Sequence, residues 1–144
     1  MCHLDQNFIF TSFLHPALPL NGGNTLPHCF SRYTASTLPL VITLEIISYT
    51  TLTANLLVGS QDLDGTRAWG MYAFSLACLA IHALNGPNMW TMMKAISDDT
   101  IPTEQNLKAL KKFLHRNLLR VALTDVPAVA ALFGAVVAVA VAKA

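Results

Sequence analysis

Three long runs of apolar residues divide this chain, at residues 38–59, 68–93 and 117–142. Each run is long enough to cross a bilayer, because a spanning helix needs about 20 mostly apolar residues. Charged residues are almost absent from the first two runs, as expected for segments that lie in lipid. The pattern predicts an all-α transmembrane bundle with three complete spans, in a single domain that covers residues 1–144.

The segment before these runs, residues 1–36, has a mixed composition. Its apolar stretch Phe8–Leu20 is interrupted by Pro16 and Pro19 and is too short to span a bilayer. It also lacks the basic start and the small-residue cleavage site of a signal peptide. We therefore expect an irregular segment or a partial first helix here, with a turn at Asn21–Gly23.

Two local patterns modify the second and third runs. The sequence Asn85-Gly86-Pro87 predicts a bend or break, because proline removes a backbone donor and clashes with the preceding turn. Broken membrane helices are tolerated where they are buried or line a cavity. Leucines at helical spacing then predict an amphipathic helix that continues into the third run without a break: Leu107, Leu110, Leu114 and Leu118.

Composition and charge support a membrane protein and suggest its orientation. The chain is 53% hydrophobic and 12% charged, whereas a soluble domain carries roughly a quarter charged residues. A net charge of +1 excludes the basic surface expected of a nucleic-acid-binding protein. Basic residues gather at positions 94–120, so the positive-inside rule predicts a cytoplasmic location for this loop. The acidic loop at residues 60–67 would then face the opposite side.

Ionisable residues inside the apolar runs are the first candidates for chemistry. An intramembrane carboxylate costs about 2.5 to 3.5 kcal/mol on insertion scales and usually has a partner. Asp125 is five residues from Arg120, a poor spacing for a pair on one face of an α-helix. Either Asp125 has a partner on another helix, or it lies shallow enough to stay hydrated. We expect Glu45, Asp125 and Arg120 to converge at one end of the bundle.

Short motifs in the chain resemble those of the anthrone-oxygenase-like family of small fungal and bacterial membrane proteins. The resemblance covers roughly residues 30–140 and rests on Tyr33, Pro39, Tyr72-Ala73, Pro87, Met93-Lys94, Asp98 and Asn117-Leu118-Leu119-Arg120. Two departures stand beside it. The family's first helix is present at most as Thr11–Pro16, and the Pro-Thr-Asn that usually follows the third helix reads Ala95-Ile96-Ser97.

The resemblance implies a four-helix bundle in the endoplasmic reticulum or another endomembrane. It also implies oxidation of an anthrone, a small aromatic polyketide, to an anthraquinone by molecular oxygen, without a metal, flavin or other bound cofactor. Such a substrate is acidic, and its carbanion reacts with oxygen directly. The protein then needs a base, donors for the enolate and an apolar cavity. If the missing part of the first helix helps to enclose the substrate, the chain would be a truncated or inactive relative.

Four residues are candidates for catalysis. His82 is the leading candidate for the base, because imidazole titrates near neutrality. The alternative, and the more frequent role of a histidine in such a run, is a hydrogen bond to a Ser or Thr of another helix. Arg120 could stabilise an enolate, or anchor its helix at the membrane surface. Asn117 could position a carbonyl or join helices, and Asp125 could serve the same site as a charge partner.

Three more residues are candidates for substrate binding. Tyr72 and Trp90 could stack on a flat aromatic ring, although interfacial aromatic residues have the same pattern. Glu45 would contribute from the first span. A different interpretation also fits the sequence. Hydroxyl and amide side chains in the first span bind neighbouring helices in membranes, so the chain could be a non-catalytic helper in a homo-oligomer or beside a partner membrane protein.

Overall fold

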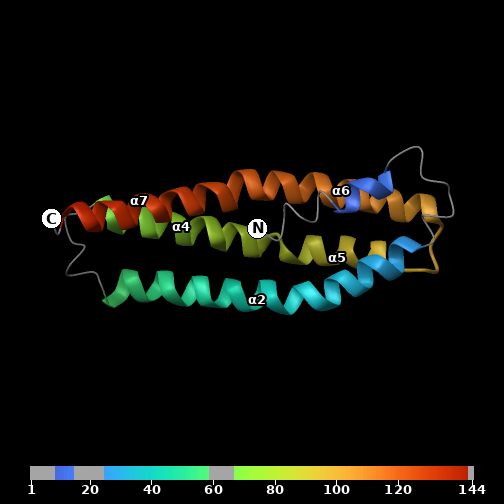
Figure 1. Ribbon diagram of the computed structural model, residues 1–144, viewed down its shortest axis with the longest axis horizontal. Coiled ribbons are helices and arrows are strands. Elements are labelled where there is room, and N and C mark those ends of the chain that lie inside the picture. Colours follow the sequence, from blue (N-terminus) through green and yellow to red (C-terminus); the bar gives the residue numbers. More distant parts are fainter. Residues whose placement is uncertain (1–8, 15–24, 59–66, 143–144) are drawn as a thin grey trace. The chain divides into compact units, whose positions relative to one another are not determined.

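The computed structural model describes residues 9–14, 25–58 and 67–142, and every element within these ranges is a helix (Figure 1). Two helices are long and apolar enough to cross a membrane, α2 (Leu26–Val58) and the continuous helix Thr103–Ala142. The pair α4 (Arg67–Leu84) and α5 (Gly86–Ser97), bent by 40°, makes a third span if it is counted as one. The prediction of an all-α helical membrane protein is confirmed.

The chain groups into two compact units. Unit 1 comprises Met1–Ile42 and Asn85–Leu119, and unit 2 comprises Thr43–Leu84 and Arg120–Ala144. Helix α2 contributes to both units, and so does the helix from Thr103 to Ala142. The single-domain interpretation stays a prediction. The expected turn at residues 21–23 and most of the acidic loop lie outside the described residues.

Helix α2 begins at Leu26, twelve residues before the apolar run that predicted it, so the irregular segment predicted to residue 36 is wrong from Leu26 onward. Pro27 lies in the first turn, where its missing N–H has no intrahelical partner to lose. The following hydroxyls bond back to the helix: Thr34 Oγ1 donates to Phe30 O at 3.0 Å and Thr37 Oγ1 to Tyr33 O at 2.8 Å. These local bonds satisfy the hydroxyls within the helix itself, so the polar stretch needs no partner outside it.

The break at Asn85-Gly86-Pro87 is confirmed, because α4 ends at Leu84 and α5 begins at Gly86. The uninterrupted entry into the last span is confirmed too. Helix α6 (Thr103–Arg120) leads through the π-helical segment η3 (Val121–Asp125) into α7 (Val126–Ala142). The predicted partial first helix is represented in the described residues by the short 3-10 segment η1 (Ser12–Leu14).

Unit 1 has an aromatic core. Phe30 lies edge-on to Phe113, with ring centroids 5.5 Å apart, and Phe10 packs on Phe30 at 5.0 Å. The buried members of this cluster come from η1's neighbourhood, α2, α5 and α6: Phe10, Leu26, Phe30, Met89, Ile96, Leu110, Phe113 and Leu114. The Nδ2 of Asn106 donates to Asp98 O at 2.8 Å, which joins α6 to the end of α5.

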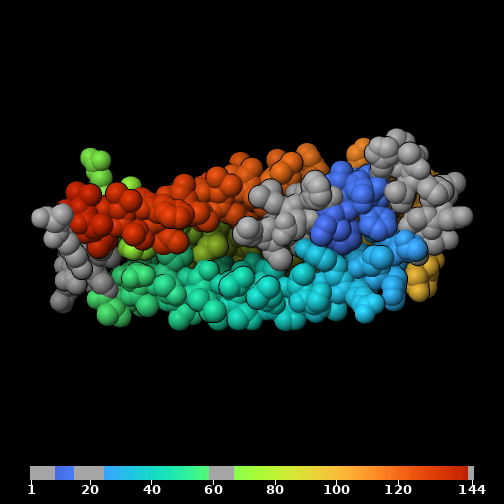
Figure 2. All heavy atoms as spheres, viewed as in Figure 1, coloured from blue at the N-terminus to red at the C-terminus, as the bar shows by residue number. Residues whose placement is uncertain are grey.

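Unit 2 is built on close contact between α4 and α7, which run side by side (Figure 1). Small buried residues on both helices, Ala68, Ala128 and Ala135, allow this approach, as in other membrane helix pairs. Outer surfaces are apolar, as a lipid surround requires, and Figure 2 shows α2 uncovered along one face. Exposed large apolar side chains include Leu44, Ile47, Leu57, Phe74, Leu132, Phe133 and Val137.

Replacing Ala135 by leucine should destabilise the α4–α7 contact. Ala135 is fully buried against Leu52, Ala68 and Tyr72, so added methylenes have no space to enter. We expect a loss of about 1–3 kcal/mol in the free energy of unfolding, measured by denaturant titration in detergent. Ala140→Leu, at an exposed position of the same helix, is the control and should change stability little. Equal stability of the two variants would contradict the packing described.

Candidate functional site

An ionisable side chain from each of three helical segments meets in unit 2. His82 Nε2 lies 2.9 Å from Glu45 Oε1, and His82 Nδ1 lies 2.6 Å from Asp125 Oδ1. His82 is buried, whereas the side chains of Glu45 and Asp125 are 32% and 23% exposed. These three residues, called here the carboxylate–histidine triad, lie near the C-terminal end of α4. The two carboxylates converge as predicted, and they do so on His82; their predicted place at one end of the bundle stays a prediction.

The two contacts fix how many protons the triad holds. A ring nitrogen and a carboxylate oxygen at hydrogen-bond distance need a proton between them, since two lone pairs would repel. Two contacts therefore contain two protons, shared among one imidazole and two carboxyl groups. Whichever groups hold them, the triad carries a net charge of −1. It can accept one further proton without breaking either contact, at a carboxylate oxygen that does not face His82.

Arg120 supplies the compensating charge. Its guanidinium interacts electrostatically with both Asp125 and Glu45, so the group of four is neutral overall. The expectation that Arg120 and Asp125 are badly spaced assumed a regular α-helix, in which residues five apart point about 140° away from each other. That assumption is wrong here, because η3 is π-helical between them.

The π-helical segment determines where Asp125 points. Val126 N–H donates to Val121 O, five residues back, instead of to the residue four back. Pro127 accounts for the interruption, because it has no N–H to donate to Leu123 O. The hydroxyl of Thr124 lies 2.6 Å from Arg120 O and 2.9 Å from Asp125 Oδ1, and so holds the carboxylate in place. Single π-helical turns are frequent at functional sites.

Two further hydrogen bonds join the helices around the triad. The hydroxyl of Tyr49 donates to the carbonyl oxygen of Leu79, linking α2 to α4. Ser75 Oγ donates to Ala128 O at 2.6 Å, linking α4 to α7. Both bonds connect a side chain of one helix to the backbone of the next. They therefore fix both the spacing between neighbouring helices and the register of one helix along the other near the triad.

One apolar cavity lies near the triad. On each of the three helices, a residue that lines it is one helical turn from the triad residue of that helix. Ser48 is three residues after Glu45, Leu79 three before His82, and Ala128 three after Asp125. Residues at this spacing share a helix face. The cavity has a volume of about 250 Å³, and its lining is mainly apolar: Ile47, Ser48, Thr51, Leu52, Ser75, Leu79, Ala128, Val129 and Leu132. A small flat molecule bound here would lie about one helical turn from the triad, whose three residues are not among those that line the cavity.

The remaining predicted site residues lie elsewhere. Tyr72 belongs to unit 2 but precedes His82 by ten residues, about 15 Å along α4, and packs against Leu52 and Ala135. Asn117, fully buried, and Trp90 belong to unit 1. The structure therefore brings together Glu45, His82, Asp125 and Arg120 of the seven predicted residues. The roles proposed for Tyr72, Trp90 and Asn117 stay predictions.

Sequence reasoning missed Tyr49, Ser75 and Thr124. Each is a hydroxyl residue in an apolar run, and this signal alone does not distinguish a helix-joining bond from a bond within one helix. Pro127 was the available signal for η3, because a proline two residues after a carboxylate residue disturbs the helix at that residue. Within the described residues, no group of His, Cys, Asp and Glu has the arrangement of a metal site.

Comparison with protein-family models, with curated proteins and with solved structures found no match for this chain. The resemblance to anthrone oxygenases therefore stays a prediction, and the carboxylate–histidine triad is the feature of the described residues that points to chemistry.

Proposed function

We propose that this chain is an integral membrane oxygenase that needs no cofactor and oxidises an anthrone-type polycyclic aromatic substrate to a quinone with molecular oxygen. The observation that carries this proposal is the carboxylate–histidine triad beside an apolar cavity. Glu45 is the most exposed member of the triad, and we assign the role of base to its outer carboxylate oxygen, about one helical turn from the residues that line the cavity. His82 and Asp125 hold Glu45 in position and share its charge.

The reaction begins with proton transfer. An anthrone carries an acidic CH₂ group opposite its carbonyl, and Glu45 takes one of these protons. The triad changes from −1 to neutral, while the substrate becomes a carbanion whose charge is spread onto its carbonyl oxygen. Arg120, which loses part of its counter-charge at that moment, is then available to the enolate oxygen. The net charge of the site is unchanged, which avoids an uncompensated charge in a medium of low dielectric constant.

Oxygen then reacts with the carbanion. One electron passes from the carbanion to O₂, and the resulting radical pair forms a C–O bond, giving a peroxide on the former CH₂ carbon. The peroxide takes the proton held by the triad. Loss of the second C–H proton and cleavage of the O–O bond give the quinone carbonyl and one molecule of water. The sum is one anthrone and one O₂ to one anthraquinone and one H₂O, which balances without an external reductant.

The cavity suits such a substrate by polarity. Its lining is mainly apolar, and the hydroxyls of Ser48, Thr51 and Ser75 give it polar points for phenol groups. Its volume of about 250 Å³ favours a small flat molecule. A lipid-soluble substrate would enter from the membrane. For topology, we propose that the basic segment 94–120 faces the cytoplasm and that the membrane is the endoplasmic reticulum or another endomembrane.

The direct test uses the purified chain in lipid nanodiscs with emodin anthrone and oxygen. We expect quinone to form well above the rate in empty nanodiscs, with one O₂ consumed per quinone, and no loss of rate with a metal chelator. Deuterium at the CH₂ carbon should slow the reaction, because proton abstraction starts it. Quinone formation no faster than in empty nanodiscs would contradict the proposal and favour a non-catalytic helper in its place.

A further inference from the structure

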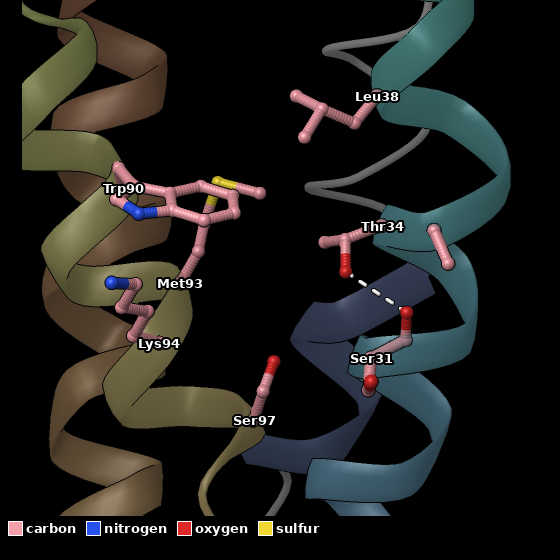
Figure 3. A pocket seen from close by; sticks show the side chains of 8 residues that line it. Ser31, Thr34, Leu38, Trp90, Met93, Lys94 and Ser97 are labelled. Carbon is pink, nitrogen blue, oxygen red and sulfur yellow. Dashed lines mark hydrogen bonds between the residues drawn. The ribbon is translucent and has the colours of Figure 1, made fainter.

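A second cavity lies in unit 1, apart from the carboxylate–histidine triad. It is a groove of about 300 Å³ between α2 and α5. Figure 3 shows side chains of the two helices facing each other across it. The lining residues are Ser31, Thr34, Ala35 and Leu38 from α2 and Trp90, Met93, Lys94 and Ser97 from α5. We call it the α2–α5 groove. Nothing in the proposed oxygenase reaction uses it.

The groove has an apolar part and a cationic edge. Leu38, Met93 and Trp90 supply the apolar part, and Lys94 lies beside them with its Nζ 5.4 Å from the centre of the Trp90 ring. Ser97, one turn after Lys94 on α5, directs its hydroxyl toward the space between the helices, whereas the amine of Lys94 lies at the side of α5 that is turned away from α2 (Figure 3). No acidic residue lines the groove. This arrangement complements a ligand with a negative group at one end and an apolar body.

The charge of Lys94 is available to such a ligand. Within the described residues the ion pairs involve other groups, and the contact of Lys94 is with the Trp90 ring. The nearest carboxylate along the chain on its C-terminal side, Asp98, is engaged by Thr100, whose N–H and hydroxyl donate to Asp98 Oδ1 at 2.9 and 2.6 Å. These two bonds lower the pKa of Asp98 and turn its charge toward the loop.

Position in the sequence places the groove at the level of lipid headgroups. Lys94 is the first charged residue after Arg67, and the residues between them are the second apolar run. On α2, the stretch from Leu38 to Val58, twenty-one residues with twenty rises of about 1.5 Å, measures about 30 Å, the thickness of a hydrocarbon core. A Trp and a Lys at this depth are typical of the membrane interface. Arg32, beside Ser31, adds a second positive charge to this level.

We propose that the α2–α5 groove is a binding site for an anionic phospholipid. The phosphate lies at the edge formed by Lys94 and Ser97, and the upper part of an acyl chain lies along Leu38, Met93 and the Trp90 ring. A single lysine near an anionic lipid surface favours binding about fivefold. This site is independent of the proposed oxygenase activity, so failure of either proposal leaves the other standing.

The two tryptophans of the chain allow a direct test. Trp69→Phe leaves Trp90 as the single fluorescent reporter, at the groove itself. In nanodiscs, phosphatidylglycerol with brominated acyl chains should quench Trp90 more than phosphatidylcholine brominated at the same carbons. We expect apparent local enrichment of the anionic lipid by about fivefold. Equal quenching by the two lipids would overturn the proposal.

Variants of Lys94 test whether the preference for phosphatidylglycerol over phosphatidylcholine arises at the α2–α5 groove. Lys94→Gln should abolish it and Lys94→Arg should retain it. The control Lys112→Gln, at an exposed position of α6, should leave it unchanged. Soluble glycerol phosphate should not displace the lipid, since it lacks the acyl chain; displacement at low concentration would identify a free phosphate site instead. A preference that survives in Lys94→Gln would overturn the proposal, and retained helicity by circular dichroism shows that each variant is folded.

Discussion

Replacing His82 by alanine is expected to reduce the rate of quinone formation by about 10²- to 10⁴-fold, the usual contribution of acid–base catalysis. Without the imidazole, Glu45 and Asp125 are two negative groups in an apolar surround with no shared proton donor. One of them must then bind a proton, and Glu45 no longer has the orientation or charge of a base. We also expect the free energy of unfolding to fall by about 3 kcal/mol, because a charge network inside the protein is broken. Both effects are measurable on one preparation in nanodiscs.

A second variant separates catalysis from stability. In His82→Ala combined with Asp125→Asn, one carboxylate has been neutralised while the base Glu45 is kept, so most of the lost stability should return while the activity should not. His115→Ala is the matched control, since His115 is exposed on α6, and it should change neither quantity. Full activity of His82→Ala would remove His82 from the mechanism. Recovery of activity together with stability in the double variant would show that His82 is structural only.

Much of the fold follows from the hydrophobic pattern. Long apolar runs determine which segments can lie in lipid, and the helix break at Asn85-Gly86-Pro87 follows from the chemistry of proline. The start of α2 at Leu26 could not be predicted from the same pattern. Residues 26–37 pack through Phe30 against Phe113, and their hydroxyls bond back to carbonyls of the same helix; neither feature has an apolar run as its signature.

The sequence predicts which residues belong to the site better than it predicts how they are arranged. Carboxylates are expensive in lipid, so Glu45 and Asp125 had to find partners, and the sequence predicts their convergence. The sequence did not predict that His82 lies between them. Which face of each helix points inward depends on the register of one helix against another, set here by Tyr49 and Ser75, and on the altered turn at η3.

Replacing Pro127 by alanine should make the protein more stable and less active. An alanine N–H can donate to Leu123 O and convert η3 into regular α-helix, which favours folding by up to about 3 kcal/mol, the cost of proline in a helix interior. The same change converts the π-helical turn into an α-helical turn, which holds one residue fewer. Asp125 is thereby rotated by about 100° relative to α7, away from His82 Nδ1. Misplacement of one group in a catalytic network can cost about 10²-fold in rate, so we expect a loss of that size. Anthrone oxidation and denaturant unfolding measure the two effects.

Opposite signs of the two effects make this test specific, because a misfolded variant would lose stability as well as activity. Pro39→Ala is the control, since Pro39 also lies inside a helix but belongs to unit 1, and it should leave the oxidation rate unchanged. The ¹⁵N resonances of His82 provide a second measurement that does not depend on substrate. The Nδ1 signal should lose the marks of a short hydrogen bond to Asp125, while Nε2 keeps its contact with Glu45. Unchanged Nδ1 and full activity in Pro127→Ala would show that Asp125 reaches His82 without the π-helical turn.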